Sequence, residues 1–158
     1  MPIDLDPRDF GDNQPCFGCS PDHPIGFHLC FTREGNEVFT RFTPGTQYQG
    51  PPGLMHGGLV TTLADEIGAW AIIGLLEKFG FTAKIDVKLR AAIRIGVEVV
   101  GRAWIVRETS RIVEVGVELT QEGSVALAGQ FAFVLMDRKG AERLLGGPIP
   151  EAWVRYCR

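Results

Sequence analysis

Hydrophobic and polar residues alternate with two different periods along this chain, and the change of period predicts its elements. Apolar residues recur at helical spacing over residues 57–79, and Gly80 follows where a helix is commonly capped. Beyond this helix the chain alternates with the period of two that is typical of half-buried strands. The four predicted strands are residues 83–89, 97–106, 112–120 and 125–136.

Two further strands are predicted before the helix. Residues 27–31 and 37–43 are β-prone and would form a hairpin across residues 34–36. Residues 43–55 are rich in Pro and Gly and are expected to be loop. One long helix with about six antiparallel strands predicts an α+β domain, in which a curled sheet wraps around a central helix. A βαβ sheet would instead need a helix between every pair of strands.

The chain of 158 residues has the length of one domain. We expect an irregular N-terminal arm (1–24), the α+β domain (25–137) and a C-terminal tail (138–158) with a helical turn at 151–156. The net charge of −3 gives no broad attraction to nucleic acid or to an anionic membrane. The first residues carry no secretory signal pattern, and no uncharged apolar stretch reaches about 18 residues, so a cytoplasmic location is expected.

Two of the four cysteines have the spacing of half a zinc site. Cys16 and Cys19 form a CxxC pair, but no second CxxC or histidine pair follows to complete four ligands. His23 and His28 lie nearby, so a metal stays an alternative. The favoured interpretation is reduced structural thiols with no bound metal.

The candidate chemistry lies where the loop enters the helix, at His56, Gly57 and Gly58. The first N–H groups of a helix have no partner within it, and glycines let a ligand approach them. With the helix dipole, these donors suit a carbonyl oxygen that becomes an oxyanion. Asp65 follows about two turns later, roughly 10 Å away, and would act on a carbonyl lying between. Its helix face is otherwise made of small residues: Gly58, Thr61, Thr62 and Ala69.

Each of these features also has a simpler structural interpretation. The adjacent acids Asp65 and Glu66 could be a solvated patch, and His56 could be a helix-entry residue that satisfies loop carbonyls. The two glycines could form only a tight turn. Together the features favour a site, because an otherwise apolar helix keeps an acid on its small-residue face.

The segment 50–58, GPPGLMHGG, resembles the GPPGxxHGG motif of a subgroup of the PaaI-like hotdog-fold thioesterases. Residues 16–26 are similar to that subgroup's CFxCGxDNPxGL signature, with His23 where Asn is commoner. Residues 82–90 resemble the strand that leaves the central helix, and the resemblance covers roughly residues 15–136. It implies a hotdog fold and hydrolysis of an acyl-CoA thioester to the free acid and coenzyme A.

The resemblance also implies roles for individual residues. The catalytic acid of such relatives lies nine residues after the motif histidine His56, which selects Asp65 and not Glu66. It implies that the N–H of Gly57 is the oxyanion donor and that Thr82 helps to hold the attacking water. It further implies a dimer or a dimer of dimers, with Asp65 of one subunit facing Gly57 of its partner.

Coenzyme A is then part of the substrate, and no separate cofactor is expected. Many relatives keep Asn or Gln six residues before the histidine, where this chain has Gly50, so Gln49 or Gln47 would substitute. Gly58 is expected to contact the substrate beside Gly57. Phosphates of coenzyme A need local cations. The resemblance points to four arginines, each of which could equally be part of a solvated strand face: Arg90, Arg94, Arg107 and Arg111.

Several alternatives stay open on the sequence alone. Asp65 could activate a water or attack the thioester itself to give a mixed anhydride. The rival functions are a hotdog enoyl-CoA hydratase or dehydratase and a non-catalytic acyl-CoA binding protein. Four apolar residues are expected to line an acyl pocket or to belong to the core: Trp70, Ile72, Phe79 and Phe81.

Overall fold

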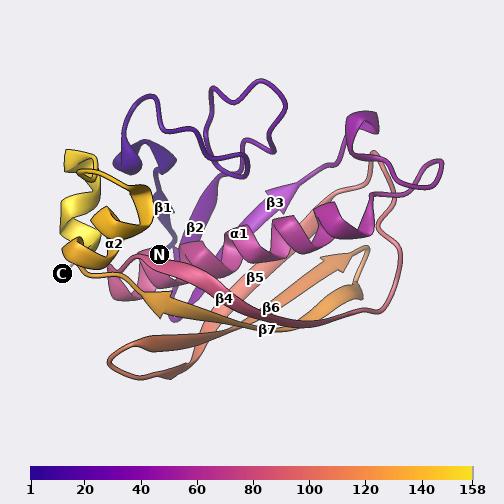
Figure 1. Ribbon diagram of the computed structural model, residues 1–158. Coiled ribbons are helices and arrows are strands. Elements are labelled where there is room, and N and C mark those ends of the chain that lie inside the picture. The colour runs from indigo at the N-terminus through magenta and orange to yellow at the C-terminus, as the bar shows by residue number, and fades with distance from the viewer. Residues whose placement is uncertain (158) are drawn as a thin grey trace.

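One long helix lies across a curled antiparallel sheet in the computed structural model, which describes residues 1–157 (Figure 1). The helix is α1 (Gly57–Leu76), and a shorter helix, α2 (Arg138–Leu145), precedes a 3₁₀ helix at Glu151–Tyr156. The α+β prediction is confirmed. The seven strands are β1 (Ile3–Leu5), β2 (Phe31–Glu34), β3 (Glu37–Phe42), β4 (Gly80–Leu89), β5 (Val99–Glu108), β6 (Ile112–Gln121) and β7 (Ser124–Leu135).

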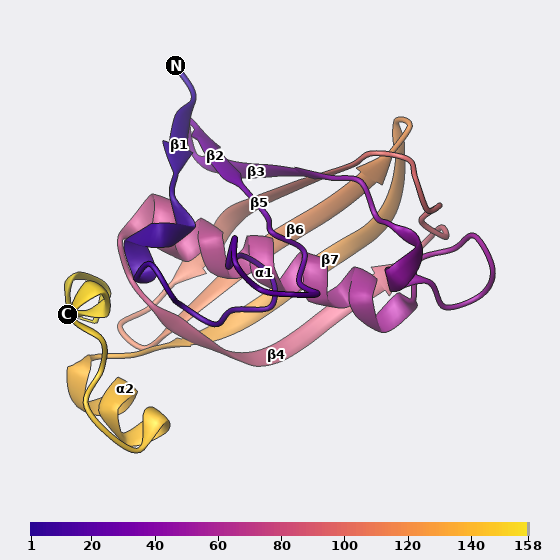
Figure 2. The ribbon, with the colours of Figure 1, turned by 90° about the horizontal axis from the view of Figure 1, so that it is seen from above.

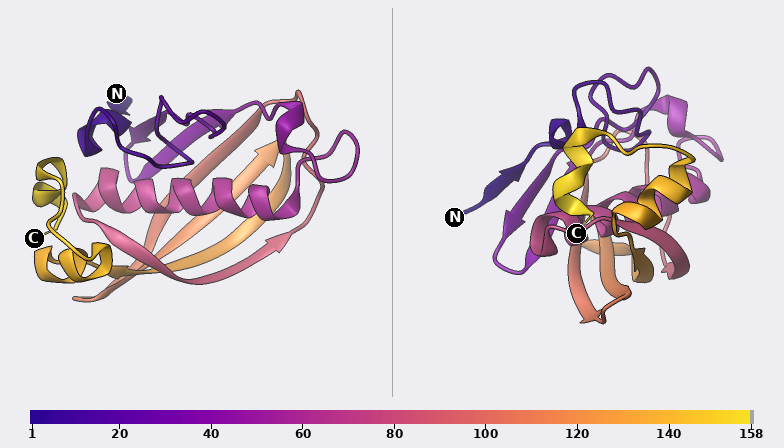
Figure 3. Two further views of the ribbon diagram at one scale, coloured as in Figure 1. Left: turned by 45° about the horizontal axis from the view of Figure 1, so that its top comes forward. Right: turned by 60° about the vertical axis from the view of Figure 1, so that its left-hand side comes forward.

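The order of the strands sets where the helix lies. The order is β1-β2-β3-β5-β6-β7-β4, so α1 connects β3, on one side of the sheet, to β4 at the far edge beside β7. Every pairing is antiparallel. The sheet curls beneath the helix (Figure 3). The strand that follows the helix therefore runs back along it, and the two outer edges of the sheet are β1 and β4.

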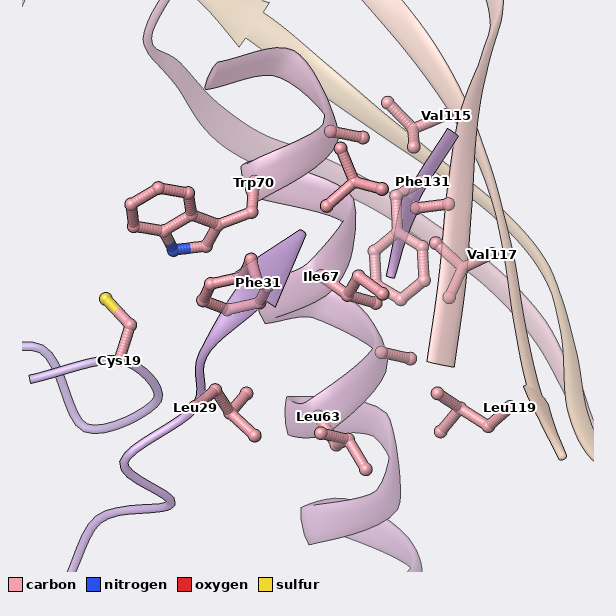
Figure 4. Packing of buried hydrophobic residues seen from close by; sticks show 14 of the residues in the cluster. Cys19, Leu29, Phe31, Leu63, Ile67, Trp70, Val115, Val117, Leu119 and Phe131 are labelled. Atoms are coloured by element: carbon pink, nitrogen blue, oxygen red, sulfur yellow. The ribbon is translucent and has the colours of Figure 1, made fainter. Parts of the chain in front are cut away.

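The core lies between α1 and the concave face of the sheet. Leu63 and Ile67 of α1 are fully buried and face the sheet (Figure 4). By length and composition alone α1 could span a membrane, yet half of its apolar stretch is buried inside this fold. The sheet residues that meet it are themselves fully buried: Val115, Val117, Leu119, Phe131 and Phe133.

The N-terminal arm covers a second side of α1 (Figure 2). Its contacts fall at Glu66, Trp70 and Gly74, which are spaced by four residues and so share one helix face. Phe10 meets Trp70 edge to face with ring centroids 5.7 Å apart. Leu5 packs so closely on Gly74 that a side chain at this position would collide with it. The arm is therefore part of the core.

The structure corrects the predicted N-terminal elements. Residues 27–30 are not a strand, because His28 has a left-handed φ of 54° and the N–H groups of Phe27 and Leu29 donate to carbonyls of residues 17 and 18 in the arm. The hairpin strand begins only at Phe31. The arm is also not wholly irregular, since residues 3–5 form hydrogen-bonded pairs with β2.

The ends of α1 and the C-terminal region also differ from expectation. The helix ends at Leu76 because Glu77 adopts a left-handed φ of 52° and donates its N–H to the carbonyl of Ile73. Gly80 consequently begins β4 instead of capping the helix. Helix α2, which the pattern did not predict, starts where Asp137 accepts a hydrogen bond from the N–H of residue 140.

Replacing Leu63 by Ala should lower the free energy of unfolding by about 2–5 kcal/mol, because the side chain is fully buried and leaves a cavity. Leu144 is the matched control, since it is also helical but 46% exposed. Leu144→Ala should change stability by less than about 0.5 kcal/mol. Urea unfolding followed by circular dichroism measures both, and equal losses would contradict the packing described.

Candidate active site

The first turn of α1 leaves the backbone N–H of Gly57 without an acceptor within residues 1–157. The Nδ1 atom of His56 accepts the N–H of Gly58 at 3.0 Å, so the histidine caps the helix with its side chain. Its own N–H donates to the carbonyl of Tyr48 at 2.9 Å. The N–H of Gly57 has no acceptor among residues 1–157, and this glycine is exposed. An oxygen that docks here meets a free N–H at the positive end of the helix dipole.

Asp65 is held by the strand that follows the helix. Because β4 runs back along α1, Thr82 comes beside Asp65 and its Oγ1 donates to Oδ1 of the carboxylate at 2.8 Å. Burial raises the pKa of Asp65, and the hydrogen bond from Thr82 acts in the opposite direction. The other carboxylate oxygen has no hydrogen-bond partner within the described part of the chain. One oxygen is therefore oriented while the other is left for a substrate or water.

A single chain does not bring these two groups together. Gly57 and Asp65 are eight residues apart on one helix, which is about 12 Å at the rise of an α-helix. A carbonyl on the Gly57 N–H therefore lies beyond contact of Asp65 in the same chain. Both residues nevertheless lie on the third side of α1, which is only partly covered, since β4 alone approaches it through Thr82 and Leu89.

The four predicted arginines divide between the two ends of the molecule. Arg90 lines a cleft of about 340 Å³ together with Gly57, and Arg94 lies beside it through a backbone bridge to Leu54. Arg94 forms an exposed ion pair with Glu122. The other two, Arg107 and Arg111, flank the β5–β6 turn away from the cleft. The structure therefore brings only Arg90 and Arg94 to the start of α1.

The loop before α1 uses its polar groups internally. The side-chain amide of Gln49 accepts the N–H of Gly53 at 2.7 Å and donates to the carbonyl of Thr46 at 3.1 Å. Gly50 lies against His56, and a Cβ at Gly50 would come within 3.1 Å of the histidine Cα. The absence of a side chain at position 50 thus lets the loop pack on the helix cap.

Most of the residues suggested for an acyl pocket belong to the core. Trp70 is 2% exposed and stacks on Phe31, and Ile72 is fully buried. Phe79 packs against the ring of Trp153. Phe81 alone of the four suggested residues is half-exposed.

The fold also brings Glu66 to the CxxC pair, a neighbour that sequence reasoning missed. Cys16 donates its thiol hydrogen to Oε1 of Glu66 at 3.2 Å, and Cys19 completes a cluster beneath the arm. Burial raises the pKa of Glu66 to about 8. A hydrogen bond from the Cys19 side chain lowers the pKa of the Cys16 thiol. The CxxC spacing signalled two members of the cluster, but nothing local pointed to Glu66, because the cysteines lie 50 and 47 residues earlier in the chain.

Comparison with protein families gives one match, over residues 52–128, to the family described as Thioesterase superfamily. This range includes the start of α1, Asp65 and Thr82. No curated protein shows significant sequence similarity to the chain.

Solved structures of thioesterases share the fold. A thioesterase superfamily protein superposes with a TM-score of 0.71 at 18% identity, over 80% of this chain and 64% of that one, so this chain spans less than two thirds of its length. Zebrafish thioesterase superfamily member 2 gives 0.65 at 22% identity, covering 73% and 89%. A hypothetical thioesterase from Streptococcus pneumoniae, solved with coenzyme A, gives 0.61 at 18% identity, covering 65% and 82%. The hotdog fold is thereby confirmed.

Replacing His56 by Ala should lower the free energy of unfolding by about 0.5–2 kcal/mol, because the Gly58 N–H loses its acceptor. His56→Asn is the matched control, since its side-chain oxygen can accept the same hydrogen bond. Urea unfolding of the two variants measures the difference. If both lose the same stability, the histidine does not act as the cap.

Proposed function

We propose that this chain, of which residues 52–128 match the Thioesterase superfamily, hydrolyses an acyl-CoA thioester with Asp65 as the catalytic carboxylate. The main support for this proposal is the position of the Asp65 carboxylate. It is partly buried on the open side of an otherwise apolar helix and is oriented by the Thr82 hydroxyl. A free N–H at Gly57 supplies the second group that acyl transfer requires. The coenzyme A in the Streptococcus pneumoniae structure supports this substrate class.

In the proposed reaction the thioester carbonyl accepts the N–H of Gly57. Asp65 takes a proton from a water whose oxygen attacks the carbonyl carbon, and the helix dipole stabilises the oxyanion that forms. The carbon–sulfur bond then breaks, and the thiolate of coenzyme A leaves and takes up a proton. Direct attack by Asp65, followed by hydrolysis of the mixed anhydride, uses the same two groups.

The distance between the two groups leads us to include a second subunit. Two chains related by a twofold axis on the open side of α1 would place Asp65 of each against Gly57 of the other. This side is suited to close contact because the helix offers small residues there, and β4 adds exposed apolar ones. Ile85 is 48% exposed and Leu89 50% exposed. Both are register partners of buried β7 residues, so they lie on the helix side of the sheet edge.

The cations at the start of α1 suit the phosphates of coenzyme A. Arg90 lies in the cleft beside Gly57 and forms no salt bridge among the described residues. The pair between Arg94 and Glu122 is exposed on both sides, and such pairs contribute little to stability. Arg94 can therefore exchange its carboxylate partner for a phosphate.

Replacing Asp65 by Asn should lower kcat for acyl-CoA hydrolysis by about 10²–10⁴-fold, because the amide cannot accept the proton. Asp86→Asn is the matched control, since Asp86 is an exposed aspartate on the outer face of β4. Release of free thiol from a panel of acyl-CoAs measures turnover. Undiminished turnover in Asp65→Asn would reject the assignment, and tight binding without thiol release by the wild type would reject the hydrolase itself.

Replacing Ile85 by Glu should convert the assembly to monomers and reduce turnover to the level of Asp65→Asn, because a charge would be buried on the proposed contact face. Leu144→Glu is the control, as this residue is similarly exposed but lies on α2. Light scattering gives the mass and the thiol assay gives the turnover. A fully active monomer would contradict the shared site.

A further inference from the structure

We infer that the N-terminal arm and α1 together form a divalent metal site, with Cys16, Cys19 and Glu66 as its ligands and zinc as the ion that fits best. One ligand atom from each residue lies within 4.8 Å of the others. Oε1 of Glu66 is 3.2 Å from the Cys16 sulfur. The CxxC pair supplies two of the ligands and the fold supplies the third from a distant helix.

These separations match the size of a zinc site. Zinc binds thiolate sulfur at about 2.3 Å and carboxylate oxygen at about 2.0–2.2 Å, so tetrahedral ligands lie about 3.3–3.8 Å from one another. The three side chains therefore need only small adjustments to surround one ion. Thiolates favour zinc over magnesium or calcium, which prefer oxygen ligands.

The burial and the acidic character of the cluster also favour a bound cation. Cys19 is 5% exposed, and Glu66 is covered by the arm. Within residues 1–157 no Lys, Arg or His forms a salt bridge with Glu66, and its hydrogen-bond donor is a thiol. Three acidic groups sharing such a place are costly to ionise without a cation. A divalent ion compensates their negative charge directly.

The loop between the cysteines is shaped around the carboxylate. A Cβ on Gly18 would come within 2.4 Å of the Glu66 Cδ, so glycine is what lets this loop close over the acid. Gln14 orients both cysteines, as its Oε1 accepts the Cys16 N–H at 2.9 Å and its Nε2 donates to the Cys19 sulfur at 3.5 Å. Such outer contacts are typical of metal sites, where they fix the direction of the ligands.

Water is the expected fourth ligand, because Cys16 is partly exposed. The two nearby histidines are engaged elsewhere. The Nε2 atom of His28 pairs with the backbone carbonyl of His23, and Nδ1 of His23 accepts the N–H of Ile25. The ion would fasten the arm to α1 one residue away from Asp65. Its binding does not depend on the reaction proposed above.

The test uses the full chain purified with a thiol reductant. Elemental analysis should find one zinc per chain, and the protein refilled with cobalt should show a thiolate-to-cobalt charge-transfer absorption. Cys19→Ser and Glu66→Gln should each weaken zinc binding by more than the about 10–100-fold lost when an outer contact is removed. Cys30→Ser and Cys157→Ser are the controls and should keep the zinc, because these cysteines lie outside the cluster.

The cobalt spectrum of the wild type needs no substitution, and circular dichroism reports whether each variant folds. Failure of the reduced wild type to bind zinc or cobalt would overturn the proposal. Unchanged affinity in folded Cys19→Ser would do the same, and unchanged affinity in Glu66→Gln would remove the helix from the site. None of these measurements involves turnover, so they fail or succeed separately from the thioesterase assay.

Discussion

Helix α1 is apolar around most of its circumference, and the rest of the structure is arranged so that these apolar side chains are removed from water. The curled sheet takes the side of α1 that carries Leu63 and Ile67, and the arm takes the side of Trp70 and Gly74. Burial of these side chains is the main favourable term available to a domain of this size. What is left is a third side, lined by small residues, and the groups proposed for catalysis lie there.

The two adjacent acids of this helix meet different surroundings because neighbouring side chains on an α-helix point about 100° apart. Asp65 is directed to the open side and is oriented by a hydroxyl from β4. Glu66 is directed under the arm and meets thiols. Helix geometry therefore gives two successive carboxylates separate chemistry, and the same helix fixes both in place.

Features with a local period could be predicted from the sequence. The existence of α1 and of the last four strands follows from the spacing of apolar residues, although α1 ends at Leu76 and not at residue 79. Features that depend on distant contacts could not. The strand β1 exists only because β2 offers it an edge, and Glu66 gains its thiol neighbours only when the arm folds back. Residues 27–30 have a strand-like pattern, but the N–H groups of Phe27 and Leu29 donate to carbonyls of the arm and not to a neighbouring strand.

The position of the arm changes how the limits of this domain should be drawn. The segment matched to the family, residues 52–128, contains α1 but none of the chain that covers Trp70. A fragment cut at those limits would expose that indole and the glycine against which Leu5 packs. The segment that matches the family is thus smaller than the packed unit, whose core includes residues of the arm. For this architecture, an expressed fragment should include every segment that packs against α1, and its ends should not be set by the extent of the family match.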